Sequence, residues 1–342
     1  MKRKIIKIIT LLLAINLVGC TIITNEKEPN KQNSIQETPI ETYQLDYTKI
    51  SPMIKENISQ EAIDISLKII DAFLQYKNQI NYEITNNKQL IMTEVGYVLN
   101  CTCPLISAFT DLNEITSYDG ITKTISWNYY LTREELEIKK NEFAKTINNY
   151  LSKLDKKDTE SMKAILLYLE LIENSVYNDK LIGEEYLKLN KKDYDLLSSP
   201  YYALTQKSGI CYGYSYALVF LYTQADIESG TVLHHGGVGS HMWVITKMDN
   251  EYYYSDPTWD LSSSPKHFGM TAKYRYENAG GYEENEGTMM NTIIPQKYTI
   301  NNQRFDEFIK KTPIEITKID VDKKEQQITF VGYEYEYTFN CK

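Results

Sequence analysis

Cys211, His241 and Asp256 follow one another in this order along the 342-residue chain. A thiol, an imidazole and a carboxylate are the groups that acyl transfer needs: a nucleophile, a base that takes its proton, and a group that orients the base. Gly209 precedes the thiol and can make a tight turn into a helix that begins at Cys211. At a helix start, the dipole favours a thiolate and the free backbone N–H groups favour a developing oxyanion.

A β-hairpin would bring the imidazole and the carboxylate together. If Asp249-Asn250 is a two-residue turn, Met248 lies opposite Glu251, and His241 becomes a diagonal neighbour of Asp256 on the same face. A three-residue loop would shift the register and separate the two side chains. The predicted triad therefore depends on a symmetric turn.

Other residues near these segments have two interpretations each. Gln206 is a possible oxyanion donor, the alternative being a solvated turn residue. Trp243 and Trp259 either line a substrate cleft or pack in the core. His234-His235 has no acidic or thiol partner at ligand spacing, so we expect a strand before the glycine-rich loop at 236–239, and no metal or cofactor.

Three stretches together resemble the bacterial transglutaminase-like superfamily: Ser199 to Ala217, His241-Met-Trp243, and Tyr252 to Asp260. The resemblance implies a papain-like core with the Cys on a helix start and the His and Asp on adjacent strands. It also implies a role for each residue: Cys211 as nucleophile, His241 as general base and acid, and Asp256 as the orienting carboxylate.

The resemblance extends over about residues 155–262, because the segment at 162–177 is similar to the helix that precedes the Cys in this superfamily. One departure is Val244, which stands where many members have Asn three residues after the His. We expect this difference to leave catalysis intact.

The start of the chain has the pattern of a secretory signal. Basic residues at positions 2–4 precede a short apolar run from Ile5 to Val18, and the sequence Leu17-Val-Gly-Cys20 resembles a bacterial lipobox. Signals of this kind lead to lipidation of the Cys, which then becomes the mature N-terminus. We expect an extracytoplasmic protein anchored to the cell membrane through Cys20, with a flexible polar tether over residues 21–43.

The formal net charge of −9 argues against nucleic acid, or an anionic membrane surface, as the main partner. Protein or peptide at the cell surface is the expected partner class. If Cys20 carries lipid and Cys211 stays free, Cys101, Cys103 and Cys341 allow at most one disulfide. A bridge between the first two would be strained, and either could instead meet Cys341.

Hydrophobic patterns along the chain predict an α+β fold in which a helix carrying the Cys at its N-terminus packs on an antiparallel sheet. Thr132-Arg-Glu-Glu135 is a capping box that opens a helix. Expected helices lie at 59–79, 132–154, after 158, and 211–223, with a turn or short helix at 198–206. Expected β segments lie at 90–92, 97–99, 121–130, 231–235, 242–247, 251–256, 314–321 and 328–339, the last two forming a terminal hairpin.

The expected organisation has five parts: a signal peptide at 1–19, the lipidated Cys and linker at 20–50, an accessory helical and β region at 51–155, a transglutaminase-like catalytic domain at 156–305, and a β-hairpin at 306–342. The expected function is cysteine-dependent hydrolysis of peptide or amide bonds through an acyl-thioenzyme. Two alternatives stay open: cross-linking to an amine acceptor, or a non-catalytic module that binds peptide or glycan.

Overall fold

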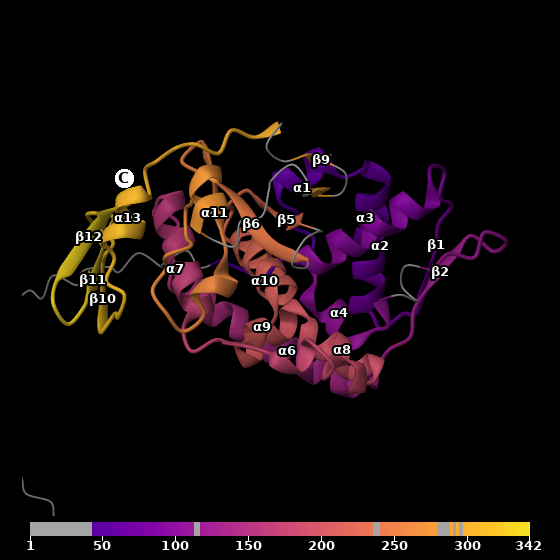
Figure 1. Cartoon of the computed structure of the whole chain (residues 1–342). Helices are drawn as coiled ribbons and strands as arrows, with labels where there is room; N and C mark the ends of the chain where they lie inside the picture. Colours follow the sequence, from indigo (N-terminus) through magenta and orange to yellow (C-terminus); the bar gives the residue numbers. More distant parts are fainter. Residues whose placement is uncertain (1–42, 113–116, 235–239, 279–287, 290–291, 294–296) are drawn as a thin grey trace, which may run out of the picture. The chain divides into compact units, whose positions relative to one another are not determined.

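The fold is α+β (Figure 1). The computed structural model describes residues 43–342 except 113–116, 235–239, 279–287, 290–291 and 294–296. The expected signal segment, Cys20 and most of the expected tether therefore lie outside the described residues. Across the described part, no helix has the length and apolar character needed to span a bilayer.

Helices occur along the whole described chain, most of them in its first two thirds. They are α1 (Pro52–Asn57), α2 (Gln60–Leu74), α3 (Lys88–Thr102), α4 (Pro104–Phe109), α6 (Arg133–Leu151), α7 (Glu160–Ile172), α8 (Lys191–Ser198), α9 (Pro200–Gln206), α10 (Cys211–Gln224), α11 (Ala272–Asn278) and α13 (Asp306–Lys311). The capping box is present at the start of α6, where the Thr132 side chain accepts from the backbone N–H of Glu135 and the Glu135 carboxylate accepts from the backbone N–H of Thr132.

The strands form several small sheets. Two-stranded pairs join β1 (Gln79–Asn81) to β2 (Thr124–Ser126), β3 (Val176–Tyr177) to β4 (Ser208–Gly209), and β8 (Thr288–Met289) to β9 (Thr292–Ile293). One three-stranded antiparallel sheet has the order β5 (Ser229–His234), β6 (His241–Met248), β7 (Glu251–Ser255). Another has the order β10 (Lys318–Asp322), β11 (Gln327–Val331), β12 (Glu336–Asn340).

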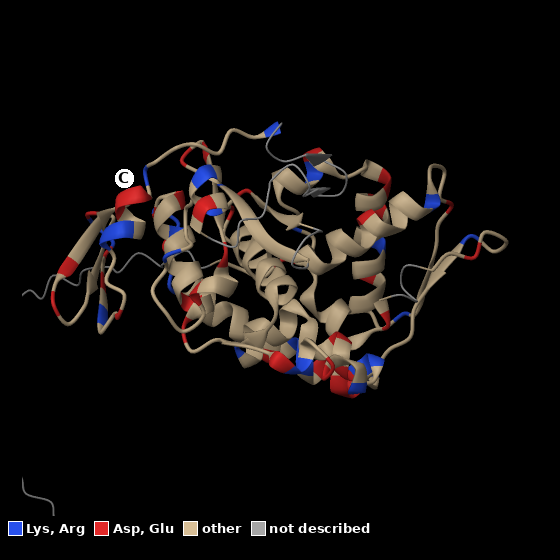
Figure 2. Ribbon diagram, in the orientation of Figure 1, with Lys and Arg blue, Asp and Glu red and all other residues tan. Residues whose placement is uncertain are grey.

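Helix α10 packs against strands β5 and β6 and against α9, α3 and α7. It contains no charged residue, so it has none of the blue or red that marks α6 and α8 (Figure 2). Because it is apolar around most of its circumference, it is buried almost throughout its length. The expected helix with the Cys at its N-terminus, packed on an antiparallel sheet, is therefore present.

The expected β segments at 90–92 and 97–99 are wrong, because both belong to helix α3. Asn87 caps this helix by accepting from the backbone N–H of Leu90, and nine of its residues are buried. Apolar residues on several faces of a buried helix give short runs that resemble strands. The expected strand at 121–130 is reduced to β2.

The expected terminal hairpin is present as the antiparallel pair of β10 and β11, but the expected single strand at 328–339 is wrong, because this segment contains two strands. The strand is interrupted at Gly332, which directly follows β11 and precedes β12. A Cβ atom at this position would lie 2.7 Å from the Cβ of Pro313, so only glycine permits the close approach. The result is a three-stranded meander.

The expected boundaries at 155/156 and 305/306 stay predictions. Buried residues from all three described parts, among them Ile63, Trp243 and Phe330, belong to one core cluster. Cys101, Cys103 and Cys341 are buried free thiols, so none of the three disulfides considered above is formed among them.

Candidate active site

His241 and Asp256 lie at the same end of the β6–β7 hairpin. His241 is the first residue of β6, and Asp256 directly follows β7. Met248 pairs with Glu251, as the symmetric turn requires, and Nε2 of His241 lies 2.7 Å from Oδ2 of Asp256. The expected register is confirmed, and it brings the imidazole and the carboxylate into a hydrogen bond.

The turn itself suits this register. Asp249 and Asn250 have positive φ angles of 52° and 69°, as a type I′ turn requires at both central positions. The Asp249 carboxylate accepts from the hydroxyl of Ser161 and pairs with Arg304, and its backbone N–H donates to the Glu160 carboxylate at 2.7 Å. The N-terminus of α7 therefore holds the hairpin turn in place.

Cys211 is the first residue of α10 and is buried. Its helix is fixed to the sheet next to His241, because the hydroxyl of Ser215 donates to the carbonyl of Met242 at 3.0 Å. The Cys211 thiol is near enough to the His241 ring to raise the pKa of the imidazole. Because Nε2 is bonded to Asp256, Nδ1 is the ring nitrogen left for the thiol.

The protonation of His241 reflects opposing effects. Burial alone lowers the pKa of the imidazole, because it disfavours the charged form. The Asp256 carboxylate and, to a smaller extent, Cys211 outweigh burial and raise the pKa from 6.5 to about 9. At neutral pH the ring is therefore held as an imidazolium, the form that pairs with a thiolate and can later donate a proton.

The approach to Cys211 differs from the expectation for Gly209. Gly209 lies in β4, which pairs with β3, and the residue with a left-handed conformation is Lys207, at φ 54°. A Cβ atom at Gly209 would make only ordinary contacts, the nearest at 3.5 Å. At Gly213, in contrast, a Cβ atom would lie 3.0 Å from the carbonyl oxygen of Ser198. The glycine that the helix start requires is therefore Gly213.

The two tryptophans near the site differ in their surroundings. Trp243 is buried in the core and stacks near the His241 ring, with centroids 6.1 Å apart. Trp259 is 48% exposed, and its indole nitrogen lies 3.3 Å from Nε2 of His241. Trp243 therefore packs in the core, whereas Trp259 borders the site from the solvent side.

Arg275 is a charged residue of the site that the sequence analysis did not identify. It lies in α11, is 1% exposed, and its guanidinium is 3.5 Å from Oδ2 of Asp256. The same guanidinium lies over the Trp243 ring, 4.2 Å from its centroid. No local motif precedes it, and burial of an arginine in a short helix is not visible in the sequence.

A second buried carboxylate, Asp260, directly follows Trp259 in the sequence. Asp260 bonds Nδ1 of His267 at 2.7 Å and accepts from the Tyr168 hydroxyl at 2.6 Å. Burial raises the pKa of Asp260. The Tyr168 hydroxyl also lies 3.0 Å from the backbone carbonyl of Asp256, so α7 supports the segment that carries both carboxylates.

The remaining predicted residues contribute less to the described geometry. Gln206 ends α9 with an exposed side chain, so its role as an oxyanion donor stays a prediction. His234 is a buried residue of β5 and pairs in register with His241. Among the described residues, no group of three or more His, Cys, Asp or Glu side chains could hold a metal ion. The glycine-rich loop lies outside the described residues.

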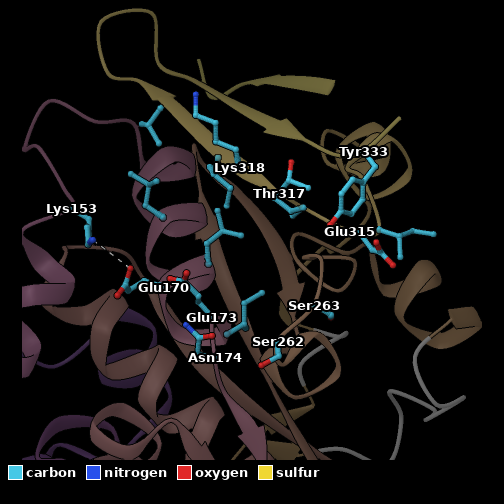
Figure 3. A pocket seen from close by; sticks show the side chains of 17 residues that line it. Lys153, Glu170, Glu173, Asn174, Ser262, Ser263, Glu315, Thr317, Lys318 and Tyr333 are labelled. Atoms are coloured by element: carbon cyan, nitrogen blue, oxygen red, sulfur yellow. Dashed lines mark ion pairs between the residues drawn. The ribbon is translucent and has the colours of Figure 1, made fainter. Parts of the chain in front are cut away.

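A groove of about 910 Å³ lies between α7 and the C-terminal sheet (Figure 3). Ser262 and Ser263 line one side, immediately after the 3-10 turn Pro257–Asp260 that carries Trp259. Tyr333 and Ile319, from the C-terminal segment, also line the groove. Ser262 therefore lies in the sequence two residues after Asp260, the last residue of this 3-10 turn.

No family model matches the chain, and no curated protein matches it. One solved structure, described as "Crystal structure of a TGase", is 13% identical to this chain, with a TM-score of 0.31. The match covers 46% of this chain and 45% of that one, so it spans less than half of either. Similarity at this level is a weak likeness to a transglutaminase.

Proposed function

We propose that this protein is a cysteine-dependent acyl-transfer enzyme in which Cys211 is the nucleophile, His241 the general base and acid, and Asp256 the orienting carboxylate. The observation that carries the proposal is the 2.7 Å contact between His241 and Asp256, in a buried site beside a cysteine at a helix start. These are the groups of a nucleophile, a base and an orienting acid in the spatial order that acyl transfer requires.

The first half-reaction forms a thioester. The thiolate of Cys211 attacks the carbonyl carbon of an amide, and the carbonyl π electrons move to the oxygen, near the backbone N–H groups at the start of α10. Collapse of the tetrahedral species breaks the C–N bond, and the leaving amine takes a proton from the His241 imidazolium. The neutral ring remains bonded to Asp256.

In the second half-reaction, His241 takes a proton from water, and the resulting hydroxide attacks the thioester carbon. The C–S bond breaks, the acid leaves, and Cys211 regains the thiolate form beside the imidazolium. An amine acceptor in place of water gives a new amide, which is the transglutaminase alternative. We favour hydrolysis of a protein or peptide at the cell surface by an enzyme anchored through Cys20.

An alkylation experiment with iodoacetamide near neutral pH tests the proposal. Burial raises the pKa of the Cys103 and Cys341 thiols to about 12 and that of Cys101 higher still, so these three should react slowly. Peptide mapping should find early modification at Cys211, which slows in His241→Ala. Equal reactivity of Cys211 and a free thiol, with no effect of His241→Ala, would overturn the proposal.

A peptide library then separates the two acceptors. Incubation with and without an added primary amine should give cleaved peptides in both samples if water is the acceptor. Peptides conjugated to the amine, with little cleavage, would instead identify a transglutaminase. Cys211→Ala is the control for either product.

The groove beside the C-terminal sheet supports a second candidate, a non-catalytic module that holds peptide or glycan. Its lining combines the exposed ring of Tyr333 with apolar side chains such as Ile319, and its volume is in the range of ligand sites. Binding of a peptide or glycan array should then persist in Cys211→Ala and disappear in Tyr333→Ala. Catalysis lost in Cys211→Ala would favour the enzyme instead.

A further inference from the structure

The Asp256 carboxylate is fully buried, and two nitrogen-bearing groups share one of its oxygens. His241 contacts Oδ2 at 2.7 Å, and the Arg275 guanidinium contacts the same oxygen at 3.5 Å. The other oxygen accepts from the backbone N–H of Thr258 at 3.3 Å. Arginine stays charged at any pH that a protein experiences, whereas the imidazole can lose its proton.

We propose that Arg275 is a positioning residue that balances the charge of Asp256 and so allows His241 to become neutral during the reaction. The inference rests on the acyl-transfer function proposed above. In that reaction His241 must give up its proton to the leaving amine and then take one from water. A group that makes the neutral state accessible therefore acts on every turnover, without touching the substrate.

The physical argument concerns the net charge of a site without bulk water. With Arg275 present, a neutral His241 leaves a carboxylate and a guanidinium that compensate one another. Without Arg275, a neutral His241 would leave Asp256 as a buried negative charge without this compensation. Since an uncompensated buried charge is costly, the imidazole would hold its proton more strongly.

The surrounding ionisable groups do not replace this charge. They are Cys211 on α10, His234 on β5, Tyr168 on α7, and Asp260 with His267 beyond Trp259. A thiol, a phenol and a carboxylate can add only negative charge, and His267 is bonded to Asp260. His234 carries an imidazole, which unlike a guanidinium is not a permanent cation.

Trp243 fixes the position of the guanidinium. Its ring lies under Arg275 at 4.2 Å and stacks near His241 at 6.1 Å, so one buried indole contacts both partners of Asp256. A planar guanidinium suits this stacked position, whereas the ammonium of lysine supplies charge with a different shape. Arg275→Lys therefore tests whether a positive charge without the guanidinium shape is sufficient. Arg275→Met tests the loss of the positive charge in a side chain of similar length.

A direct test follows the protonation of His241 by NMR of protein labelled with ¹⁵N-histidine. The signal is assigned by its loss in His241→Gln. We expect Arg275→Met to move the titration midpoint of His241 upward by about one pH unit or more, and Arg275→Lys to stay close to the wild type. Arg133→Met is the matched control, because Arg133 lies over the ring of Tyr76 rather than in the site. An unchanged or lowered midpoint in Arg275→Met would overturn the proposal.

A second variant covers the case in which Arg275→Met does not fold. The cost of Arg275→Met can instead be measured in an Asp256→Asn background, where it should be smaller than in the wild-type background, because the guanidinium then has no carboxylate to balance. If Arg275→Met is as costly in the Asp256→Asn background as in the wild type, Arg275 does not act through Asp256. These measurements do not depend on turnover, so they separate the role of Arg275 from the proposed function, which fails if Cys211 shows no enhanced alkylation.

Discussion

Met248 lies directly opposite Glu251 across the β6–β7 hairpin, and this pair determines which side chains of the two strands share a face. Because side chains alternate along a strand, a shift by one residue would turn His241 away from Asp256. The position of the turn is therefore as important to the site as the two residues themselves. It is held by residues 249–250 and by their contacts with α7.

The turn can be tested at Asn250, which has a φ of 69°. Asn250→Val should lower the free energy of unfolding by roughly 1–2 kcal/mol, because a β-branched residue is strained in the left-handed region. Asn250→Gly should keep or slightly raise it, since glycine adopts this conformation without strain. Urea denaturation measures both. Equal stabilities of the two variants would contradict the assigned turn.

The helix start can be tested with two glycines that differ in their surroundings. Gly213→Ala should lower the free energy of unfolding by roughly 1–3 kcal/mol, because its Cβ atom would press on the carbonyl oxygen of Ser198. It should also slow alkylation of Cys211 by displacing the start of α10. Gly209→Ala is the matched control, with an expected cost of less than about 1 kcal/mol. A greater loss of stability in Gly209→Ala than in Gly213→Ala would contradict the close approach of Gly213 to Ser198.

The raised pKa of His241 predicts a pH dependence of stability. The folded pKa of about 9 lies above the ordinary value, so the imidazolium stabilises the folded state fully below about pH 6.5. This contribution is lost as the pH rises through 9. The difference in free energy of unfolding between wild type and His241→Gln should therefore shrink from pH 6 to pH 10.

Asp256→Asn serves as the control for this measurement, because the carboxylate is what opposes the effect of burial on the pKa of His241. In that background the difference caused by His241→Gln should vary little over the same range.

The raised pKa of His241 also predicts that catalysis, like stability, decreases at high pH. Amide hydrolysis should fall as the pH rises through 9, since the leaving amine then lacks a proton donor. A constant rate to pH 10 would contradict the role of His241 as acid.

The two tryptophans should separate stability from activity. Trp243→Ala removes a buried indole that contacts Arg275 and should cost about 3–5 kcal/mol of stability. Trp259→Ala removes a half-exposed side chain and should cost much less, but it should change kcat/KM because Trp259 borders His241. Thermal denaturation and peptide hydrolysis of the two variants provide the comparison. Similar losses of stability would contradict the assignment of Trp259 to the rim.

The sequence was sufficient for elements with local signals. The capping box at Thr132 predicts the start of α6, and the two-residue turn predicts the hairpin register. Helix α3 was mistaken for strands because its apolar residues lie on several faces, which removes the helical period from the pattern. The Asn87 cap was the signal that could have identified it.

Tertiary contacts explain what the sequence did not reveal in the site. Arg275 approaches Asp256 because α11 packs beside β7, and nothing within its own segment indicates that contact. Gly213 and Gly209 cannot be told apart in the sequence, because both are glycines close to Cys211. They differ only in the structure, where a Cβ atom at Gly213 would approach the carbonyl oxygen of Ser198. Residues whose roles depend on a neighbour distant in sequence were therefore missed, whereas those with a local cause were found.

The buried thiols can report local unfolding, because a reagent reaches each of them only when the surrounding structure opens. Cys101 and Cys103 report on the α3–α4 segment, and Cys341 reports on the end of the C-terminal sheet. A thiol-specific mass tag added in a pulse would reach each of them only when its surroundings open. Comparison of tagging at the two locations would show whether the C-terminal sheet detaches before the helical region or unfolds together with it.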